Sequence, residues 1–427
     1  MCYAIPGKII SQEDNIAIID YFGEERKVMN EFEEIGIGDY VYAQGGIVLV
    51  KVPEEEAKET LLFWKDKFSE LKEIDKDISK VEEIKASDNL IEILQKVNHR
   101  KELSKEDVSF LLGLKDPQEL KLLFEFANNL RQKEHDNACC VHGILEFSNY
   151  CQHNCMYCGI RNSADIARYR MTEEEIFEAV KKNVDELGFR GIVIQSGEDP
   201  WYTEERLASI VKSLRKLGIL IFLSIGIRSK ETYDKLYEAG ARAILLRFET
   251  SNDEIFERMR PGTNLQERLD LIKWLKERGY LVATGFLVGL PGEKKEDIVN
   301  NVFLMKELGV EMYSFGPFIP CEKTPLGDEG LVDKNLMLKI ISICRLIDFK
   351  SKILVTSALE TLNALARKQG LMAGANSLMI NTTPKSFKDA YELYPGRPDK
   401  DKDIALNIKE TVDLLYSIGR APTDLGL

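Results

Sequence analysis

The sequence predicts an α/β protein: a (βα)8 barrel of the TIM type, preceded by a small all-β barrel domain of OB-like form. From residue 143 onward, strand-like runs alternate with amphipathic helical stretches in eight units over about 260 residues, which fits a closed barrel better than an open sheet. Before residue 62, short β-rich runs are separated by polar turns. A charged stretch with helical spacing joins the two parts.

Length and composition indicate a soluble globular protein of more than one domain. The chain has 427 residues, of which 44% are hydrophobic and 30% are charged. A net charge of −13 argues against nucleic-acid binding, which requires a basic stripe. No apolar run reaches the roughly 18 residues of a membrane span, and no N-terminal run has the pattern of a secretory leader. We therefore expect a cytoplasmic protein.

The first 62 residues are expected to form the β domain. Its β-rich runs are 7–10, 16–22 and 40–52. A charged helical linker is expected over 63–87, and its most charged part, 72–85, suits either a linker or the solvated face of a helix. Residues 88–141 are expected to add short helices, one of them N-capped by Ser104. The barrel and its C-terminal helices are expected over 142–427.

The barrel is expected from eight strands and the helices between them. The strands are 143–147, 191–195, 220–225, 243–248, 282–288, 312–315, 353–356 and 377–380. The helices include 173–187, 203–217, 231–239, 265–278 and 295–308. Active-site groups of such barrels lie at the carboxyl ends of the strands. Unusual residues at those ends are therefore the functional candidates.

Three of the eight cysteines crowd into the loop after the first barrel strand: Cys151, Cys155 and Cys158. Thiolates at spacings of four and three can bind three irons of a 4Fe-4S cluster, whereas an ordinary electron-transfer cluster takes four cysteines. The open fourth iron is the arrangement of a radical S-adenosylmethionine (SAM) enzyme, in which SAM chelates that iron and is cleaved reductively to a 5′-deoxyadenosyl radical. A zinc site is the alternative, but the remaining nearby ligand, His153, lies awkwardly inside the loop.

The other cysteines are expected to be less specialised. Cys139 and Cys140 are adjacent, which is a rare arrangement for ligands of one metal, so we interpret them as ordinary thiols. Cys344 lies in an apolar helical stretch and is predicted to be a core residue. Cys321 follows a strand end and is a candidate for facing the cavity.

Charged residues follow the second and fourth strands. Glu198 comes after Gly197, which permits close backbone approach, and its carboxylate can accept hydrogen bonds from an ammonium group. Arg247 and Glu249 flank Phe248, so the two charges point to the same side of the strand. Burying such a pair without a function would be costly.

Weaker candidates follow in the second half of the barrel. Arg268 lies on the next helix and could equally be a surface arginine. Thr356, Ser357 and Met379 end the seventh and eighth strands, where hydroxyls can either bind a small anion or cap the strand.

Several motifs occur in an order that identifies a family. They are Glu146 to Cys151, Tyr157 to Arg161, Gln195 to Asp199, Leu246-Arg247 with Glu249-Thr250, Gly285 to Gly292, Gly316 to Pro320 and Leu393 to Gly396. From about residue 88 to its end, the chain resembles the HydE-type radical SAM maturases of FeFe-hydrogenase, within the biotin synthase superfamily. That resemblance implies a 4Fe-4S cluster and SAM as cofactors, and an electron donor such as ferredoxin or flavodoxin.

The resemblance also implies roles for individual residues. Tyr157 would lie near the adenine, Glu249 would bind the ribose hydroxyls and Arg268 would pair with the SAM carboxylate. Met312 would lie against the SAM moiety. The residues implied to line the substrate cavity are Ser196, Arg247, Thr356, Ser357, Met379 and Tyr394.

The chain departs from the HydE pattern at three places. Ile227 stands where the family usually has an acidic residue, and Phe248 stands where it usually has a histidine. The cysteines that hold an optional second cluster in some members have no counterpart after Cys344.

The N-terminal segment resembles a second family. Met1 to Lys8 matches the N-terminal signature of the HypC family of NiFe-hydrogenase maturation chaperones, and Val52 to Leu62 continues the match. In that family Cys2 and a later histidine hold an iron with carbon monoxide and cyanide ligands. Here Gln44 occupies the expected histidine position. Two interpretations stay open: the domain carries iron through Cys2, or it only docks a partner.

Together these observations predict a HypC-like domain fused to a HydE-like radical SAM barrel, acting in the assembly of an organometallic iron cofactor. The expected substrate is a small molecule or an iron-bound, cysteine-type species, and other hydrogenase maturation proteins are the expected partners. A related enzyme function is a transformation of a small amino acid, as in the lysine mutase of pyrrolysine biosynthesis. A function of another class is a metal-carrying scaffold that acts through the HypC-like domain.

Overall fold

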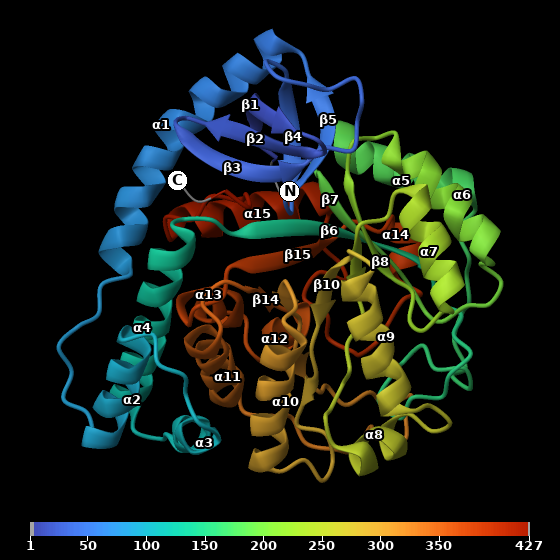
Figure 1. Cartoon of the computed structure of the whole chain (residues 1–427). Helices are drawn as coiled ribbons and strands as arrows, with labels where there is room; N and C mark the ends of the chain where they lie inside the picture. Colours follow the sequence, from blue (N-terminus) through green and yellow to red (C-terminus); the bar gives the residue numbers. More distant parts are fainter. Residues whose placement is uncertain (1–3, 426–427) are drawn as a thin grey trace.

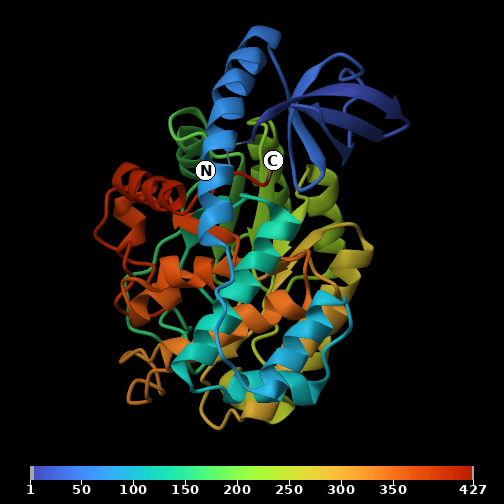
Figure 2. The same ribbon diagram turned by 90° about the vertical axis from the view of Figure 1, so that its left-hand side faces the viewer.

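The computed structural model describes residues 4–425, which form two closed barrels (Figure 1). The small N-terminal β-barrel lies over one end of the larger parallel barrel, and the views in Figures 1 and 2 agree on this placement. The expected fold, a TIM-type barrel with a small all-β barrel before it, is confirmed. Cys2 lies outside the described residues.

The small barrel has five strands in the order β1-β2-β3-β5-β4. Their bounds are β1 Pro6–Glu13, β2 Ile16–Tyr21, β3 Glu24–Met29, β4 Tyr40–Gln44 and β5 Ile47–Val52. The expected run 40–52 is two strands, because Gly45 and Gly46 adopt positive φ values of 60° and 78° and turn the chain. Strand β3 was not expected, because it is mostly charged and Val28 is its one fully buried side chain.

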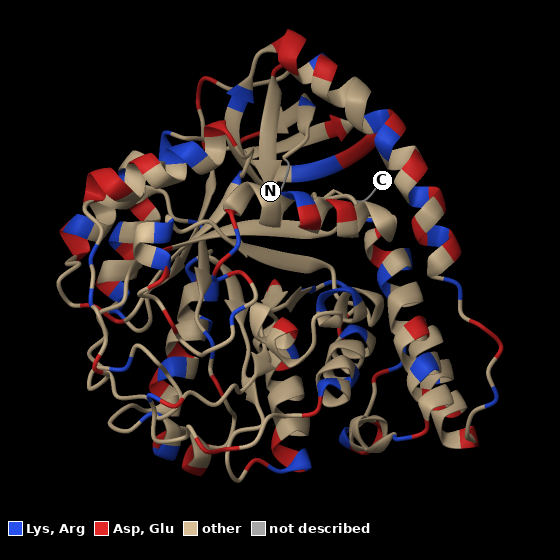
Figure 3. Ribbon diagram, turned by 180° about the vertical axis from the view of Figure 1, so that it is seen from behind, with Lys and Arg blue, Asp and Glu red and all other residues tan. Residues whose placement is uncertain are grey.

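Helix α1 (Glu54–Ile78) follows and crosses the expected boundary at residue 62. Its Trp64, Phe68 and Leu71 join the core of the small barrel. Asp75 near its end is fully buried and forms a bidentate ion pair of 2.7 Å with Arg131 of α4, and it also lies 3.2 Å from Arg420. This buried pairing fixes α1 against the larger barrel. Figure 3 shows both signs of charge interspersed along the length of α1.

Three helices precede the larger barrel: α2 Asp88–Asn98, α3 Lys105–Gly113 and α4 Pro117–His135. The expected N-cap of α3 is confirmed. The Ser104 side chain accepts from the Asp107 backbone N–H, and the Asp107 carboxylate accepts from the Ser104 N–H, which completes a capping box.

Eight parallel strands close the larger barrel in the order β10-β12-β14-β15-β6-β7-β8-β9. Their bounds are β6 Cys140–Ser148, β7 Gly191–Ser196, β8 Leu220–Ser224, β9 Ala243–Leu245, β10 Leu281–Thr284, β12 Met312–Tyr313, β14 Lys352–Val355 and β15 Ser377–Asn381. The expected strand 282–288 is interrupted at Gly285, where a Cβ would lie 2.1 Å from the Ser314 carbonyl oxygen. Past this point β11 (Leu287–Val288) pairs instead with β13 (Gly316–Pro317).

Every barrel strand is followed by helix. The helices are α5 Glu173–Asp185, α6 Glu204–Arg215, α7 Lys230–Ala239, α8 Asp253–Met259, α9 Leu265–Glu277, α10 Lys295–Leu308, α11 Lys334–Ile347, α12 Ser357–Leu362, α13 Ala366–Met372, α14 Lys385–Lys388 and α15 Ile404–Ser417. Among the described residues, no helix combines the length and apolar character that a membrane crossing requires.

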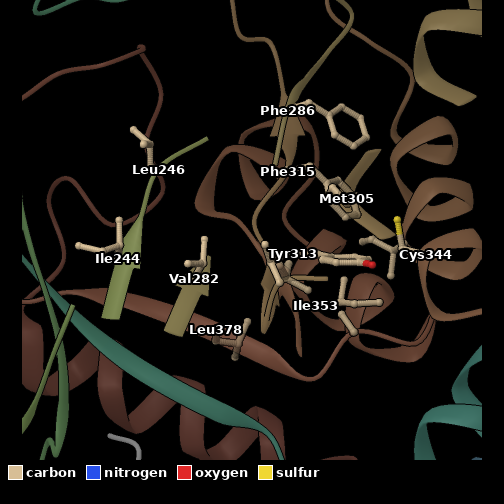
Figure 4. Close-up of a cluster of buried hydrophobic side chains, with 14 of the residues drawn as sticks. Ile244, Leu246, Val282, Phe286, Met305, Tyr313, Phe315, Cys344, Ile353 and Leu378 are labelled. Carbon is tan, nitrogen blue, oxygen red and sulfur yellow. The ribbon is translucent and has the colours of Figure 1, made fainter. Parts of the chain in front are cut away.

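Alternate residues of the barrel strands contribute to the apolar core between the strands and the helices. Ile244 and Leu246 belong to the large buried apolar cluster (Figure 4), whereas Leu245 between them packs against a smaller cluster inside the barrel. Met305 of α10 and Cys344 of α11 belong to the same large cluster. Cys344 is fully buried, and burial raises the pKa of its thiol, so its predicted core position is confirmed.

The small barrel packs on the amino-terminal end of the larger one. Ile47 and Leu49 of β5 share an apolar cluster with Leu220 and Phe222 of β8. Beside this contact, Glu31 lies 2.9 Å from Arg215 and 2.8 Å from Arg242. The two barrels therefore bury both apolar and paired charged groups against each other.

Candidate active site

A cavity of about 300 Å³ opens at the carboxyl end of the larger barrel. We call it the mouth cavity. It collects almost all of the predicted site residues. Those lining it are Cys151, Cys155, Cys158, Tyr157, Ser196, Glu198, Arg247, Glu249, Arg268, Thr356, Ser357, Met379 and Tyr394. Its size falls at the lower end of the range of small-molecule sites.

The three cysteines lie on the loop between β6 and α5, on the wall of the mouth cavity. Gly197 on the neighbouring strand end allows this loop to approach, because a Cβ there would lie 2.2 Å from the Tyr150 carbonyl oxygen and 2.8 Å from Cys151 Cβ. Burial raises the pKa of the Cys155 and Cys158 thiols. Such thiols become thiolates when iron binds them, because a metal ion displaces the proton.

The donor set suits a cluster better than a single ion. Among residues 4–425, no three His, Cys, Asp or Glu side chains converge as ligands for one metal ion. His153, the candidate fourth zinc ligand, is instead paired with Glu198 at 2.8 Å. Three thiols spread over separate irons of a cubane do not need to converge on one point. The structure therefore gives no support to the zinc alternative.

Glu198 is the centre of a buried charge network on the cavity wall. It accepts from His153 at 2.8 Å and from Arg260 at 3.3 Å, and Arg268 Nη1 lies 3.9 Å away. Burial acts to raise the pKa of this carboxyl group, but the His153 hydrogen bond and the two arginine charges outweigh it, so the pKa is lowered. Gly226 makes room for the carboxylate, because a Cβ there would lie 2.0 Å from Glu198 Cγ.

Arg247 and Glu249 both face the mouth cavity, as their position around the buried Phe248 implies. Glu249 Oε2 lies 3.5 Å from Arg247 Nε but makes no hydrogen bond. The Glu249 backbone has a φ of 70°, in the left-handed region that glycine favours. Strain of this kind typically costs about 1–3 kcal/mol and is found at functional sites.

Unsatisfied polar atoms mark where a ligand would bind. Glu249 Oε2, Arg268 Nη1 and Thr356 Oγ1 are all buried on the cavity wall without a hydrogen-bond partner. Buried groups of this kind are nearly always paired in proteins, so a polar ligand is expected to contact them. Ser357 and Tyr394 differ, because their hydroxyls bond each other at 2.7 Å. The residues present thus fit a cluster with SAM beside it.

Among the residues of this cavity that the sequence did not reveal are Arg260, Glu146, Arg397 and Asn381. Arg260, at the end of α8, is buried and donates to the Tyr157 hydroxyl at 3.1 Å. Glu146 of β6 accepts from Arg397 and from Asn381, each at 2.9 Å. The one signal that could have found Arg397 is its place directly after the Leu393 to Gly396 motif.

Met312 and Cys321 do not line the mouth cavity. Met312 lies on the short strand β12, and the next inward position, Ser314, is the one that reaches the cavity. Met312 instead lines a second cavity toward the other end of the barrel, which places it away from the residues it was predicted to join. Cys321 is buried, but it is absent from the cavity wall.

Comparison with known proteins agrees with this geometry. Residues 145–305 match the radical SAM superfamily, residues 1–64 the HupF/HypC family and residues 314–411 the biotin and thiamin synthesis associated domain. The chain is similar to the FeFe hydrogenase maturase subunit HydE of Thermotoga maritima, at 38% identity over 78% of this chain and 95% of that protein. It is also similar to 3-methylornithine synthase of Methanosarcina acetivorans, at 31% identity over 79% of this chain and 95% of the relative.

Solved structures show the same fold. A crystal structure of methylornithine synthase matches with a TM-score of 0.70 and 29% identity, over 78% of this chain and 97% of the other. The hydrogenase maturase HydG of Carboxydothermus hydrogenoformans matches with a TM-score of 0.67 and 19% identity, over 85% of this chain and 84% of the other. The family implies a 4Fe-4S cluster and SAM as cofactors. The chain belongs to the radical SAM superfamily, within the group that contains HydE, and it carries an N-terminal domain of the HupF/HypC family.

Proposed function

We propose that this radical SAM enzyme acts in the assembly of an organometallic iron cofactor of the hydrogenase type, on a small iron-bound, cysteine-type substrate. The observation that carries this proposal is the mouth cavity, where three thiols on one wall face a set of buried charged groups with unfilled hydrogen-bonding capacity. The similarity to HydE supports it, at 38% identity over nearly the whole of that protein.

The residues of the wall divide into two groups by position. Cys151, Cys155 and Cys158 would hold the cluster, which when bound supplies the electron for reductive cleavage of SAM to a 5′-deoxyadenosyl radical. Arg268 Nη1 would bind the SAM carboxylate, and Glu198 its ammonium group. Tyr157 and Glu249 would contact the adenosine. These assignments give a hydrogen-bond partner to Arg268 Nη1 and Glu249 Oε2, which have none within the protein.

The substrate would lie deeper in the barrel. Arg247 and Thr356 would hold its carboxylate by charge-assisted hydrogen bonds, since the Thr356 hydroxyl has no partner in the protein. Ser196, Met379 and the Ser357–Tyr394 pair would complete the walls around it. The closed barrel would exclude water from the reacting atoms.

The test is an anaerobic reconstitution followed by two assays. Protein with iron and sulfide restored should bind about four irons and, with SAM and a ferredoxin- or flavodoxin-type electron donor, release 5′-deoxyadenosine. The reconstituted enzyme should then support activation of an apo-hydrogenase in a mixture lacking its usual HydE. Cleavage of SAM without any hydrogenase activation would contradict the assembly function while leaving the enzyme class intact.

A second candidate is the rearrangement of a small amino acid. The fold matches the methylornithine synthase structure over nearly its full length, and the cavity carries arginine and carboxylate groups that suit an amino acid. Incubation with lysine and SAM separates the candidates. Formation of a methylornithine product would favour this second function, and its absence alongside hydrogenase activation would favour the first.

A further inference from the structure

The loop that carries the three cysteines has no regular secondary structure. Residues 149–169, between β6 and α5, form neither helix nor strand. We call residues 149–164 the cluster loop. Backbone N–H and C=O groups in such a segment find no partners in a ladder of their own, so other groups must satisfy them. The shape of the cluster loop therefore depends on what bonds to its backbone.

The middle of the cluster loop is fixed by the backbone of other segments. Three of its amides donate to carbonyl oxygens outside it, and the pairs are Gln152 to Glu198 at 3.0 Å, Met156 to Met259 at 2.8 Å and Gly159 to Leu393 at 2.8 Å. The last approach is so close that a Cβ on Gly159 would lie 2.1 Å from the Glu392 carbonyl oxygen. These bonds leave the two ends of the loop to be held by other means.

One side chain, Arg168, holds both ends. Its guanidinium donates to five backbone carbonyl oxygens of the cluster loop: those of Asn149 at 2.5 Å, Ile160 at 2.9 Å, Arg161 at 2.5 Å, Asn162 at 3.3 Å and Ala164 at 3.2 Å. The first carbonyl lies two residues before Cys151, and the other four follow Cys158. Arg168 thus joins the segments on either side of the three cysteines.

An arginine suits this position better than any other side chain. A guanidinium carries five N–H donors in one plane and no acceptor, so it can serve several carbonyls at once. Hydrogen bonds from a charged donor are roughly twice as strong as those between neutral groups. A lysine would keep the charge of Arg168, but its single ammonium group on a flexible stem lacks the fork that spans both ends of the loop.

The charge of Arg168 also acts on the cysteines. Burial lowers the pKa of Arg168, whereas the sulfurs of Cys151 and Cys158 act to raise it. These two cysteines therefore lie within electrostatic range of the guanidinium. Arg170, two residues further along, differs because it forms a bidentate ion pair with Asp199 at 2.7 and 3.0 Å, so a carboxylate balances its charge.

We propose that Arg168 is a positioning residue for the 4Fe-4S cluster: it holds the cluster loop in its ligating shape before the cluster binds, and its positive charge makes the bound cluster easier to reduce. Reduction adds one electron, supplied by an external donor of the ferredoxin or flavodoxin type, and therefore one negative charge near Arg168. The inference rests on the three cysteines holding a cluster, as in the proposed function, but on neither the substrate nor the hydrogenase.

The first measurement uses the full-length protein without its cluster. Amide hydrogen exchange in peptides from residues 149–164, read by mass spectrometry, reports how often the cluster loop opens, because its bonded amides lose their partners when it does. Arg168→Lys and Arg168→Gln should each speed this exchange roughly tenfold or more. The peptide that contains β8 should exchange at the wild-type rate, since a local opening leaves the barrel folded.

The second measurement is the reduction potential of the reconstituted cluster, followed by electron paramagnetic resonance. Arg168→Gln removes the charge, so at a fixed potential the ratio of reduced to oxidised cluster should fall about threefold or more, which is roughly 30 mV for a one-electron couple. Arg168→Lys keeps a charge beside the loop, so its potential should stay near that of wild type. A purely structural role for Arg168 would not separate the two variants in this way.

Arg206→Gln is the matched control. The Arg206 guanidinium lies 3.7 Å from the centre of the Trp201 ring and donates to the Trp201 carbonyl oxygen at 3.2 Å, so this variant removes one positive charge outside the cluster loop. Loop exchange and potential should both stay at the wild-type values. Wild-type loop exchange in both Arg168 variants, or the same potential in wild type and Arg168→Gln, would overturn the proposal. An equal shift of potential in the Lys and Gln variants would also overturn it.

The outcomes distinguish this proposal from the proposed function. If the wild-type enzyme failed to activate a hydrogenase, the assembly function would be refuted and the role of Arg168 would stand. If the enzyme activated a hydrogenase but its Arg168 variants kept wild-type loop exchange and potential, the reverse would hold.

Discussion

The two ends of the larger barrel bury polar groups in opposite ways. At the mouth, several arginines and carboxylates line one cavity, and Glu249, Arg268 and Thr356 each keep an atom without a hydrogen-bond partner. At the amino-terminal end, where the small barrel docks and which we call the floor, most of the contact is apolar, and the charged residue Glu31 is paired by both Arg215 and Arg242. The mouth is incomplete without a ligand, whereas at the floor the charge that the docked domain brings is paired, although Gln44 Oε1 keeps no hydrogen-bond partner. Substitutions at the mouth should therefore change chemistry, and substitutions at the floor should change stability.

The largest effect is expected at the cysteine loop. Cys155→Ala should abolish both the cluster and SAM cleavage, because two remaining thiolates cannot hold a cubane. Iron content and 5′-deoxyadenosine release are the measurements. Cys321→Ala is the control, since that thiol is buried away from the cavity wall and its loss should leave both unchanged. If the Cys155 variant cleaved SAM at the parent rate, the mouth cavity would not be the active site.

The next effect belongs to the floor and should be one of stability. Ile47→Ala removes a buried side chain from the cluster that joins the two barrels, so the free energy of unfolding should fall by about 2–4 kcal/mol. Ile37→Ala is the control, because Ile37 is 68% exposed and its truncation should change that free energy little. Denaturant unfolding measures both variants. If Ile47→Ala lost SAM cleavage per folded molecule instead, the division between the two ends would be wrong.

A smaller effect separates two residues of the mouth. Arg268→Ala should weaken SAM binding by about 2 kcal/mol, roughly thirtyfold in Kd, since it removes a buried charged donor whose Nη1 makes no hydrogen bond within the protein. Glu249→Gln should weaken it less, because one acceptor oxygen remains. Lys273→Ala, an exposed position on the same helix, is the control. Equilibrium binding of SAM to the reconstituted protein measures all three, and unchanged affinity in both mouth variants would show that SAM lies elsewhere.

The smallest effect concerns the ion pairs at the floor. Burial acts to raise the pKa of Glu31, but hydrogen bonds and the charges of Arg242 and Arg215 outweigh it and lower the pKa. A carboxyl group with a lowered folded-state pKa stabilises the protein above its ordinary pKa, and this contribution is lost as pH falls through the folded value. Glu31→Gln should cost about 1 kcal/mol or less at neutral pH, because the side chain is partly exposed.

The pH dependence provides the check. The difference in unfolding free energy between wild type and Glu31→Gln should shrink in acid, whereas Glu33→Gln, at an exposed neighbour, should show little difference at any pH. If the loss of unfolding free energy in Glu31→Gln stayed constant into acid, packing of the Glu31 side chain, and not its charge, would account for that loss.

Much of the mouth could be predicted because its signals are local in the chain. The cysteine loop lies within eight residues, and the positions of Glu198, Arg247 and Thr356 at strand ends follow from strand periodicity and barrel topology. Arg260 was missed because its partners Tyr157 and Glu198 are 103 and 62 residues away. Met312 was misplaced with respect to the cavity because strand β12 is short, and one inward step of two residues decides which cavity a side chain meets.

The sequence by itself determined the two barrels, most of their elements and the ligand spacing of the cysteine loop, since periodicity and spacing are properties of short segments. Tertiary structure alone decided which buried polar atoms lack partners, and that the N-terminal domain closes the floor of the larger barrel. It also gave two adjacent cysteines different surroundings, placing Cys139 in the outer core and Cys140 beside His142 and Gln44. The physical reason is that hydrogen bonding and ligation depend on distances between groups far apart in the chain, here 96 residues for Gln44 and Cys140, and packing sets those distances only after the segments have folded and docked.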